Sequence, residues 1–239
     1  MLYLIGLGLN KDGISKYGLE MAQRCKKVYL ENFTVDFPFS KQELKEVIEK
    51  EITLLDREKV EDLSIVDEAK KKDVALLVYG SPLVATTHIV IIDEAKRSNV
   101  KVKVIHAGSI LDAVAETGLQ LYKFGKIASM PAWKKSFTPD SFMEIIKENK
   151  SINAHSLILI DIGLSFDDAM NQLQKSADNH QIKLDKILIC QKLGTQRSKI
   201  LYGNINLLKD SSRISPPFCI IIPGKLHFVE KEILESFSI

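Results

Sequence analysis

The chain is poor in the residues that build disulfide or thiolate sites. Its 239 residues include only three cysteines, Cys25, Cys190 and Cys219, which lie far apart and lack the paired spacing of a zinc or dithiol site. This pattern favours reduced thiols and a cytoplasmic location. The sequence also lacks a Gly-Xaa-Ser-Xaa-Gly elbow and a phosphate-binding loop with Gly-Lys-Ser or Gly-Lys-Thr, so it offers no specific support for hydrolase or nucleotide-triphosphate chemistry.

Neither charge nor long apolar runs stand out. Lys plus Arg number 33 against 31 for Asp plus Glu, so the net charge of +2 supplies no overall field for nucleic acid or an anionic membrane. No apolar run is long enough to span a bilayer, and Met1 to Gly6 contains no basic leader. We expect no nucleic-acid partner, no membrane association and a cytoplasmic protein that recognises partners through a local surface.

What the sequence does contain is an alternation of apolar runs and segments of helical period, which is typical of an α/β fold. Several runs are apolar throughout, as expected for strands of a mainly parallel sheet that is covered on both faces. Helices are expected between them, one of them beginning with a capping box at Ser40 and Glu43. The predicted strands of the first half are Leu2 to Leu9, Lys27 to Phe33, Ile52 to Asp56, Asp73 to Tyr79 and Val100 to His106.

The second half changes in character. A connecting stretch, Leu119 to Trp133, leads to a predicted helix at Pro139 to Glu148, where the proline suits a first helical turn. Later apolar runs are separated by short turns, which predicts antiparallel neighbours and a mixed sheet. These runs are His155 to Ile162, Lys186 to Leu193, Lys199 to Gly203 and Phe218 to Ile222. We therefore predict two α/β domains, residues 1–124 and 125–239, with a cleft between them.

Glycine-containing loops follow three of the predicted strands. Gly6-Leu7-Gly8 allows close approach of backbone to a ligand, although it is not a full dinucleotide fingerprint and a tight structural turn explains it equally well. Gly80 to His88 and His106 to Ile110 each join a buried strand to a helix, where free N–H groups can meet a carboxylate. Two such loops on one sheet edge favour a binding cleft, while plain strand-to-helix connections remain the alternative.

The five histidines do not form a metal site by their spacing. His106 and His155 border apolar runs, His180 lies in a polar stretch, and His88 and His227 sit beside loops that could face a cleft. None pairs with another at ligand spacing, so structural roles are the default and no metal is expected.

Several strings, taken together, resemble the diphthine synthase family over nearly the whole chain. They are Leu4 to Leu9, Gly80 to His88, Ser109 to Gly118, Leu121-Tyr122-Lys123-Phe124-Gly125, and Pro223-Gly224-Lys225-Leu226-His227-Phe228-Val229-Glu230. The resemblance implies two α/β domains of tetrapyrrole-methylase type, a homodimer, and S-adenosylmethionine (S-adenosyl-L-methionine) bound in the cleft between the domains. The implied substrate is elongation factor 2 that already carries a 3-amino-3-carboxypropyl group on a histidine, whose amino group is methylated to form diphthine. Archaeal relatives trimethylate the amine and eukaryotic relatives also esterify the carboxylate; this short chain looks more like the archaeal form.

The same resemblance implies the cofactor-binding positions, while no catalytic residue is assigned. They are Leu9, Ser81, Val84, Ser109, Ile110, Ile160, Tyr202 and His227. Similar proteins commonly have aspartate where this chain has Ser81 and alanine where it has Tyr202. If a carboxylate at the first position matters, its loss costs on the order of 1.5 to 3 kcal/mol.

Methyl transfer needs no dedicated base, because an amine can lose its proton to solvent before attack, and alignment alone can supply roughly 7 to 11 kcal/mol. Lys225 is a hypothetical ligand of the substrate carboxylate, with loop solvation as the alternative. Rival interpretations are a methylase of the same fold acting on a tetrapyrrole or ribosomal RNA, a non-catalytic cofactor-binding module, and, more weakly supported, a nucleotide-dependent oxidoreductase.

Overall fold

The computed structural model describes residues 1–211 and 213–239 of the chain. Its contacts divide the chain into two compact units, Met1–Asp112 and Ala113–Ile239. The division comes earlier than the boundary expected between residues 124 and 125. The reason is that the segment between these positions is held by the C-terminal helix: Gly118 lies against Ile233, and the Gln120 N–H donates to Glu230 at 3.0 Å.

The N-terminal unit alternates strands and helices along the chain. Its elements are β1 (Leu2–Gly6), α1 (Lys16–Arg24), β2 (Lys27–Glu31), α2 (Lys41–Ile48), β3 (Ile52–Leu55), α3 (Arg57–Glu61), α4 (Ser64–Ala69), β4 (Val74–Val78), α5 (Ile89–Arg97), β5 (Val102–Ile105) and α6 (Ile110–Ala113), the last of which reaches the boundary. The strands form one five-stranded sheet in the order β3-β2-β4-β1-β5, and all its pairings are parallel. The predicted parallel α/β arrangement is confirmed.

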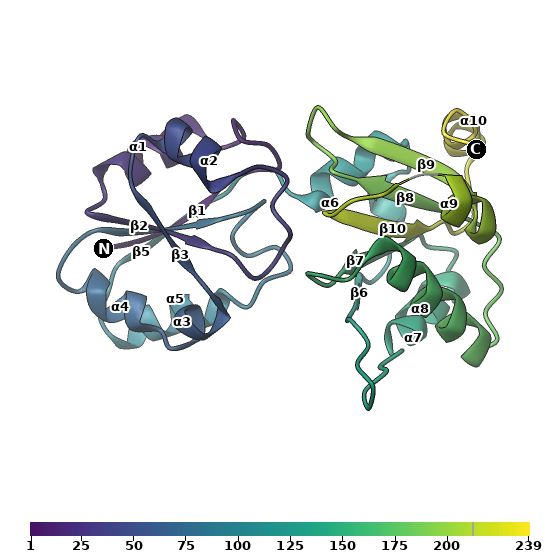
Figure 1. Cartoon of the computed structure of the whole chain (residues 1–239), viewed down its shortest axis with the longest axis horizontal. Coiled ribbons are helices and arrows are strands. Elements are labelled where there is room, and N and C mark those ends of the chain that lie inside the picture. The colour runs from purple at the N-terminus through teal and green to yellow at the C-terminus, as the bar shows by residue number, and fades with distance from the viewer. Residues whose placement is uncertain (212) are drawn as a thin grey trace. The chain divides into compact units, whose positions relative to one another are not determined.

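Helices cover both faces of this sheet. Figure 1 shows α1 and α2 on one face and α3, α4 and α5 on the other. The central strand β4 is buried at every position, which explains why its sequence shows no polar alternation. Ser40 and Glu43 form the predicted capping box at the start of α2, and the Ser15 hydroxyl caps α1 by accepting from the Gly18 N–H at 3.0 Å.

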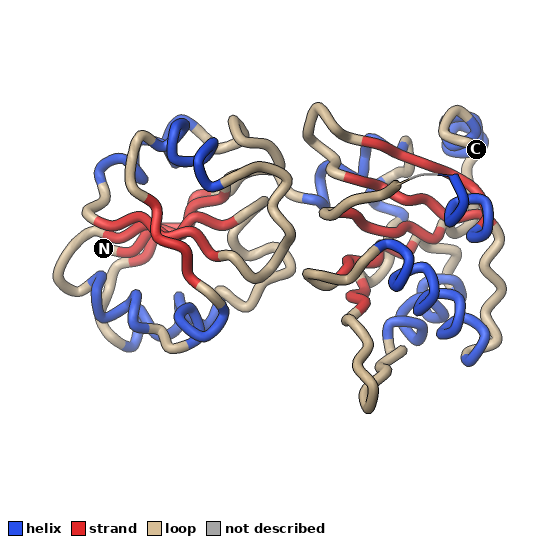
Figure 2. Tube along the Cα trace, in the orientation of Figure 1, coloured by secondary structure: helices blue, strands red, loops and turns tan. Residues whose placement is uncertain are grey.

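The C-terminal unit contains the remaining elements. They are the 3-10 helices η1 (Val114–Thr117) and η2 (Leu121–Lys123), followed by β6 (Ala128–Met130), α7 (Phe142–Ser151), β7 (Ser156–Ile160), α8 (Phe166–Asn179), β8 (Lys186–Gln191), β9 (Lys199–Asn204), α9 (Ile205–Ser211), β10 (Phe218–Ile222) and α10 (Phe228–Glu235). Figure 2 shows that the strands of each unit form their own sheet. This second sheet has the order β6-β7-β10-β8-β9, with β6 parallel to β7 and the other pairs antiparallel. The predicted mixed sheet is confirmed, and its core lies against α7, α8 and α9.

The elements that sequence periodicity missed are short. β6 has three residues, α3 five, α4 six and α9 seven, which is less than the span over which a period becomes visible. The helix predicted from Pro139 begins instead at Phe142, because the Pro139 carbonyl accepts the indole N–H of Trp133 at 2.9 Å and is held outside the helix. Among the described residues, no helix combines the length and apolar character needed to cross a bilayer.

Candidate functional site

The connections of the N-terminal sheet change direction between β1 and β4. The chain leaves β1 through α1 toward β2, and it leaves β4 through α5 toward β5, on the opposite face. β1 and β4 are neighbours, so their carboxyl ends flank a topological switch point, where ligands of open α/β sheets bind. The loops that follow these two strands therefore form the candidate site.

Two glycines join these loops directly. The Gly8 N–H donates to the Gly80 carbonyl at 3.1 Å, and the Gly80 N–H donates to the Gly8 carbonyl at 2.9 Å. Their φ angles of +69° and +71° lie in the left-handed region, where other residues are strained. This pair of reciprocal hydrogen bonds therefore favours glycine at both positions.

The loop after β5 packs onto the end of β1 at Gly6. A Cβ at Gly6 would lie 2.6 Å from the Gly80 carbonyl oxygen and 3.0 Å from the Cβ and N of Ala107, which leaves no room for a side chain. Gly108 is different, because a Cβ there would meet nothing within 4 Å. The edge therefore combines a tightly packed glycine under the loops with an open stretch of backbone that a ligand can approach.

Ser81 and His106 meet across the end of β1. Ser81 follows β4 and is 5 % exposed, and its Oγ lies 3.0 Å from Nδ1 of the exposed His106, which follows β5. Since β1 lies between β4 and β5, this hydrogen bond joins the loops that follow two non-adjacent strands. His106 was singled out only as bordering an apolar run, and its partnership with Ser81 depends on strand order, which the sequence does not state.

Tyr79 anchors the loop that follows β1. Its hydroxyl donates to the Leu9 carbonyl at 2.9 Å, and its ring packs against Phe37 and Phe39 with centroid distances of 5.4 and 6.0 Å. Burial raises the pKa of Tyr79, so the phenol remains a neutral donor at physiological pH. The predicted contact Leu9 is thereby held by a residue that sequence reasoning did not identify.

The other predicted contacts of this unit lie on the same loops. Ser109 is 4 % exposed, and both its N–H and its hydroxyl donate to Asp112 Oδ2, at 2.7 and 2.9 Å. Val84 and Ile110 are half-buried, and the Val84 N–H donates to the Ser81 carbonyl at 3.1 Å. The structure therefore brings the N-terminal positions to one edge of the sheet.

The predicted contacts of the C-terminal unit are not brought together in this way. Ile160 ends β7 and Tyr202 lies within β9, with β10 and β8 between those strands, a separation of about 14 Å at the usual strand spacing. The Tyr202 side chain is buried, with Lys186 Nζ 5.0 Å from its ring centroid. Its N–H already donates to the Phe237 carbonyl at 2.9 Å, and its carbonyl accepts the Ile239 N–H at 3.2 Å, so neither the side chain nor the backbone N–H is free for a ligand. His227 is exposed and caps α10, its Nδ1 accepting from the Val229 N–H at 3.4 Å.

Beside His227 lies a buried carboxylate that sequence reasoning missed. Glu230 is fully buried and accepts four donors: the N–H groups of Gln120 and His227, at 3.0 and 2.7 Å, His155 Nε2 at 3.1 Å, and Lys123 Nζ. Burial raises the pKa of Glu230, but the hydrogen bonds, led by that of Lys123, outweigh burial and lower it to about 2. The only signal in the sequence was the recurrence of Glu230 and Lys123 within the strings that carry the family resemblance.

The protonation of His155 follows from its partners. Its Nδ1 accepts the Gly224 N–H at 2.9 Å, so Nε2 is the nitrogen that donates to Glu230. Burial lowers the pKa of His155, which keeps the ring neutral at pH 7, against the opposing effect of Glu230. The network ties the string around Lys123 to the one around Gly224.

His88 is buried and does not face a cleft, although its place beside a glycine-containing loop allows that position. It is 1 % exposed, its Nδ1 lies 3.0 Å from the Pro82 carbonyl, and its ring meets Phe33 edge-on at 6.3 Å. Its Nε2 has no hydrogen-bond partner within the described part of the chain. The ring holds the loop after β4 in shape.

Comparison with known proteins agrees with this architecture. The sequence model of the family described as Tetrapyrrole (Corrin/Porphyrin) Methylases matches residues 1–208. A diphthine synthase of Methanococcus aeolicus is 36% identical over 250 residues, covering 98% of this chain and 97% of the relative. A protein of Arabidopsis thaliana described as a "probable diphthine methyl ester synthase" is 35% identical over 272 residues, covering 100% and 98%. A crystal structure of diphthine synthase superposes with a TM-score of 0.91 at 33% identity, covering 99% of this chain and 95% of the other.

Proposed function

Since this chain belongs to the tetrapyrrole methylase family and, within it, to the diphthine synthases, we propose that it methylates elongation factor 2 in diphthamide biosynthesis. In this proposal, S-adenosylmethionine is the methyl donor. The acceptor is the amino group of the 3-amino-3-carboxypropyl-histidine, and the product is diphthine. The main support is the similarity to diphthine synthases, which is 36% identity to the Methanococcus aeolicus protein over 98% of this chain. The glycine loops that meet at the switch point of the parallel sheet support it further.

The residues at this edge fit such a donor. S-adenosylmethionine combines an amino-acid end and ribose hydroxyls, which need hydrogen-bond partners, with a flat base that needs close backbone approach. The open backbone at Gly108 and the pair formed by Ser81 and His106 offer both kinds of contact. The proposed contacts are Leu9, Ser81, Val84, Ser109 and Ile110 in the N-terminal unit and Ile160, Tyr202 and His227 in the C-terminal unit. Tyr202 is the least supported of them, because its side chain is buried and its N–H donates to the Phe237 carbonyl.

S-adenosylmethionine supplies a methyl group bonded to a positively charged sulfonium sulfur, and the neutral thioether that remains after transfer is a good leaving group. The protein therefore has to bind both reactants, align the amine behind the methyl carbon and exclude water, which together can lower the barrier by roughly 7 to 11 kcal/mol. The amine proton passes to solvent before attack. No side chain is assigned to proton transfer.

By the resemblance, Ser81 is one of two positions at which this chain departs from similar proteins, which commonly have aspartate there. A neutral hydroxyl replaces a charged acceptor, which costs on the order of 1.5 to 3 kcal/mol if the carboxylate contacts the donor. His106 is placed to offset part of this loss, because its hydrogen bond fixes the direction of the Ser81 hydroxyl.

A second candidate acceptor is the carboxylate of the same adduct. It is favoured by the 35% identity to the Arabidopsis thaliana protein whose name refers to a methyl ester. Lys225 is exposed, and its side chain is proposed to hold this carboxylate when the amine is the acceptor. An unchanged Michaelis constant for the factor in Lys225→Ala would count against that role.

The test is methyl transfer to the modified factor. Purified protein is incubated with S-adenosylmethionine and elongation factor 2 bearing the unmethylated adduct, and the modified peptide is weighed by mass spectrometry. Added methyl masses that persist in mild base indicate N-methylation, whereas a methyl lost in mild base indicates the ester.

Absence of added mass would refute the proposal. Donor binding without transfer to this factor would then favour a methylase acting on a tetrapyrrole or ribosomal RNA, or a non-catalytic module. A homodimer and a cytoplasmic location belong to the same proposal, and sedimentation equilibrium of the purified chain tests the first of them.

A further inference from the structure

A tight hairpin of residues 134–137 projects from the C-terminal unit between β6 and α7. Figure 1 shows this connection extending away from the neighbouring helices and strands of the unit. The Lys134 N–H donates to the Phe137 carbonyl at 2.9 Å, and the Phe137 N–H donates to the Lys134 carbonyl at 3.0 Å. These reciprocal hydrogen bonds close a turn over Lys135 and Ser136, so the tip has a defined shape.

The base of the hairpin is fixed to the rest of the unit. The Gln172 side chain of α8, which is buried, accepts the Trp133 N–H at 2.9 Å and donates to the Pro131 carbonyl at 3.0 Å. The Trp133 indole closes the other side by donating to the Pro139 carbonyl. A loop held in this way loses little conformational entropy when it binds a partner, which favours a role in recognition over that of a passive connection.

The tip of the hairpin presents free positive charge. Lys134 and Lys135 are both exposed. In the described part of the chain neither lysine pairs with a carboxylate, and residues 131–139 contain no acid. The next acid along the chain, Asp140, faces Nε2 of His180 at 3.3 Å instead. The two lysine charges are therefore available to a partner.

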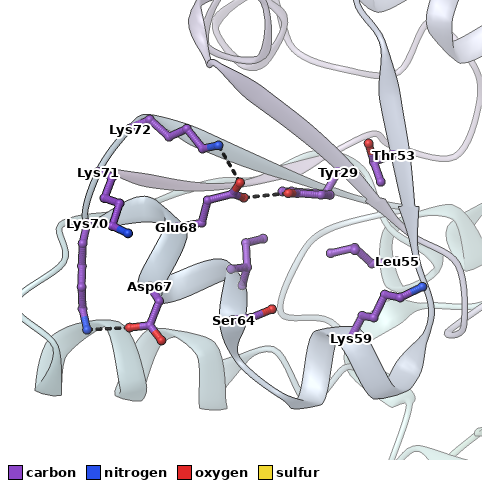
Figure 3. Close-up of a pocket in the computed structure, with 11 residues that line it drawn as sticks. Tyr29, Thr53, Leu55, Lys59, Ser64, Asp67, Glu68, Lys70, Lys71 and Lys72 are labelled. Atoms are coloured by element: carbon purple, nitrogen blue, oxygen red, sulfur yellow. Dashed lines mark hydrogen bonds and ion pairs between the residues drawn. The ribbon is translucent and has the colours of Figure 1, made fainter.

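The lysines of the N-terminal unit show the opposite arrangement. A groove of about 920 Å³ lies beside α4, and Figure 3 shows Lys70 and Lys72 on its rim, where they pair with Asp67 and Glu68. These charges cancel locally, so an acidic partner would have to break ion pairs before it could bind there. The hairpin lysines have no such pairs to lose.

An aromatic ring lies next to the free charges. Phe137 is 62 % exposed, although its backbone is fixed by the bonds of the turn. Aromatic side chains supply much of the binding energy of protein interfaces, and free charges raise the rate and specificity of association. The tip therefore combines an apolar anchor with two cations.

The hairpin begins beside one of the proposed donor contacts. Met130, the last residue of β6, is the register partner of Ile160, and its carbonyl accepts the Asp161 N–H at 3.1 Å. Asp161 Oδ2 in turn accepts the Ala132 N–H at 3.2 Å, two residues before the hairpin. A macromolecule that brings a methyl acceptor to this edge of the sheet therefore meets the hairpin.

On the basis of the proposed function, we propose that the 134–137 hairpin grips the protein that carries the methyl acceptor. Lys134 and Lys135 lie on an acidic surface of that protein, and Phe137 enters an apolar depression beside it. The hairpin thus contributes affinity for the whole acceptor protein and takes no part in methyl transfer.

A polynucleotide fits this surface less well. It carries charge along its whole length, and its affinity grows with the number of phosphates that are neutralised. The hairpin offers only two cations, while Glu144 and Asp167 are exposed at the starts of α7, which follows the hairpin, and α8, which holds its base. These acids would repel the phosphates that lie beyond the tip.

The test is steady-state methylation of elongation factor 2 that carries the unmethylated adduct. In Lys134→Glu/Lys135→Glu we expect KM for the factor to rise about tenfold, because two attractions become repulsions, while kcat and the calorimetric affinity for S-adenosylmethionine stay unchanged. Lys134→Gln/Lys135→Gln should give an intermediate increase. The matched control, Lys101→Glu/Lys103→Glu, makes the same change of charge at exposed positions at and before β5, and less than a twofold change is expected there.

Phe137→Ala tests the ring separately from the charge. The ring is exposed, so the fold should persist while KM for the factor rises several-fold. An unchanged KM in the hairpin variants, or equal increases in the hairpin and control variants, would overturn the proposal. So would binding of an oligouridylate that the glutamate substitutions in the hairpin abolish, because the partner would then be a nucleic acid. Absence of transfer by the unmodified protein is a distinct result, which refutes the proposed function and this partner with it.

Discussion

Replacing Glu230 by glutamine should destabilise the C-terminal unit strongly although it changes the size of the side chain very little. The buried carboxylate accepts four donors, from Gln120, Lys123, His155 and His227. The glutamine amide has one acceptor oxygen in place of the two oxygens of the carboxylate, and its NH₂ group faces the donors of the oxygen that it replaces. At least one buried donor therefore loses its partner. Lys123 also loses its counter-charge.

Two independent estimates of the cost agree. Removing one partner of a buried ion pair costs about 3 to 5 kcal/mol, and Lys123, whose side chain is 23% exposed, can regain some hydration and so favours the lower end. The pKa of Glu230 falls from 4.5 to about 2, which corresponds to about 3 kcal/mol of preference for the charged form in the folded state. We expect Glu230→Gln to lose about 3 kcal/mol at pH 7.

The dependence on pH has a definite sign. The folded pKa is lower than the unfolded value, so the stabilisation is complete above about pH 5 and disappears as the pH falls toward 2. The difference in free energy of unfolding between the unmodified protein and Glu230→Gln should therefore be largest near neutrality and shrink in acid.

Denaturant unfolding measures this difference. The only tryptophan of the chain, Trp133, lies in the C-terminal unit, so its fluorescence reports the unfolding of that unit. Glu235→Gln, on the same helix, is the control, because its pair with Lys186 is half exposed and its loss should have little effect. A loss below about 1 kcal/mol for Glu230→Gln at pH 7, or a loss that does not vary with pH, would refute the reasoning.

Three further predictions concern the glycine loops. Gly6→Ala should lower stability by about 1 to 3 kcal/mol in thermal unfolding because its Cβ meets fixed backbone, whereas Gly108→Ala, which meets open space, should not; equal stability of the two variants would contradict this. Ser81→Ala and His106→Ala should each weaken donor binding in calorimetry, and the double variant should lose less than the sum, since the two side chains act through one hydrogen bond; strictly additive losses would show that they act separately. Tyr79→Phe should cost about 1 kcal/mol of stability and also weaken donor binding, because the first loop loses its anchor; unchanged affinity would separate that anchor from the site.

Much of the fold was predictable from local patterns. Continuous apolar runs identified the strands of the parallel sheet, and the spacing of Ser40 and Glu43 identified the start of α2, because both signals reside in residues close together in the chain. The same reasoning failed at β6 and α9, whose lengths leave no room for a period. It also misplaced the start of α7, because the hydrogen bond that holds the Pro139 carbonyl outside the helix comes from the Trp133 indole six residues earlier, and no helical period or capping pattern signals that bond.

The candidate site was only partly predictable. The glycine loops stood out by type and position, and Ser109 was implied by the family resemblance; the structure places them at one edge of the sheet. Tyr79 was invisible because an aromatic residue after a strand is ordinary, and its role depends on reaching Leu9, which is remote in sequence. Tyr202 was named only by resemblance, and its buried side chain follows from the mixed sheet around it.

The sequence by itself determined the class of fold, the loops and the family, because periodicity, turn chemistry and strings of residues are local properties. Only the tertiary structure decided which side chains meet. Strand order sets Ser81 beside His106, and the docking of α10 sets Glu230 on four donors from three separate segments. Hydrogen bonds and ion pairs act over a few ångströms. Which side chains come that close is decided by the packing of segments that lie far apart in the chain.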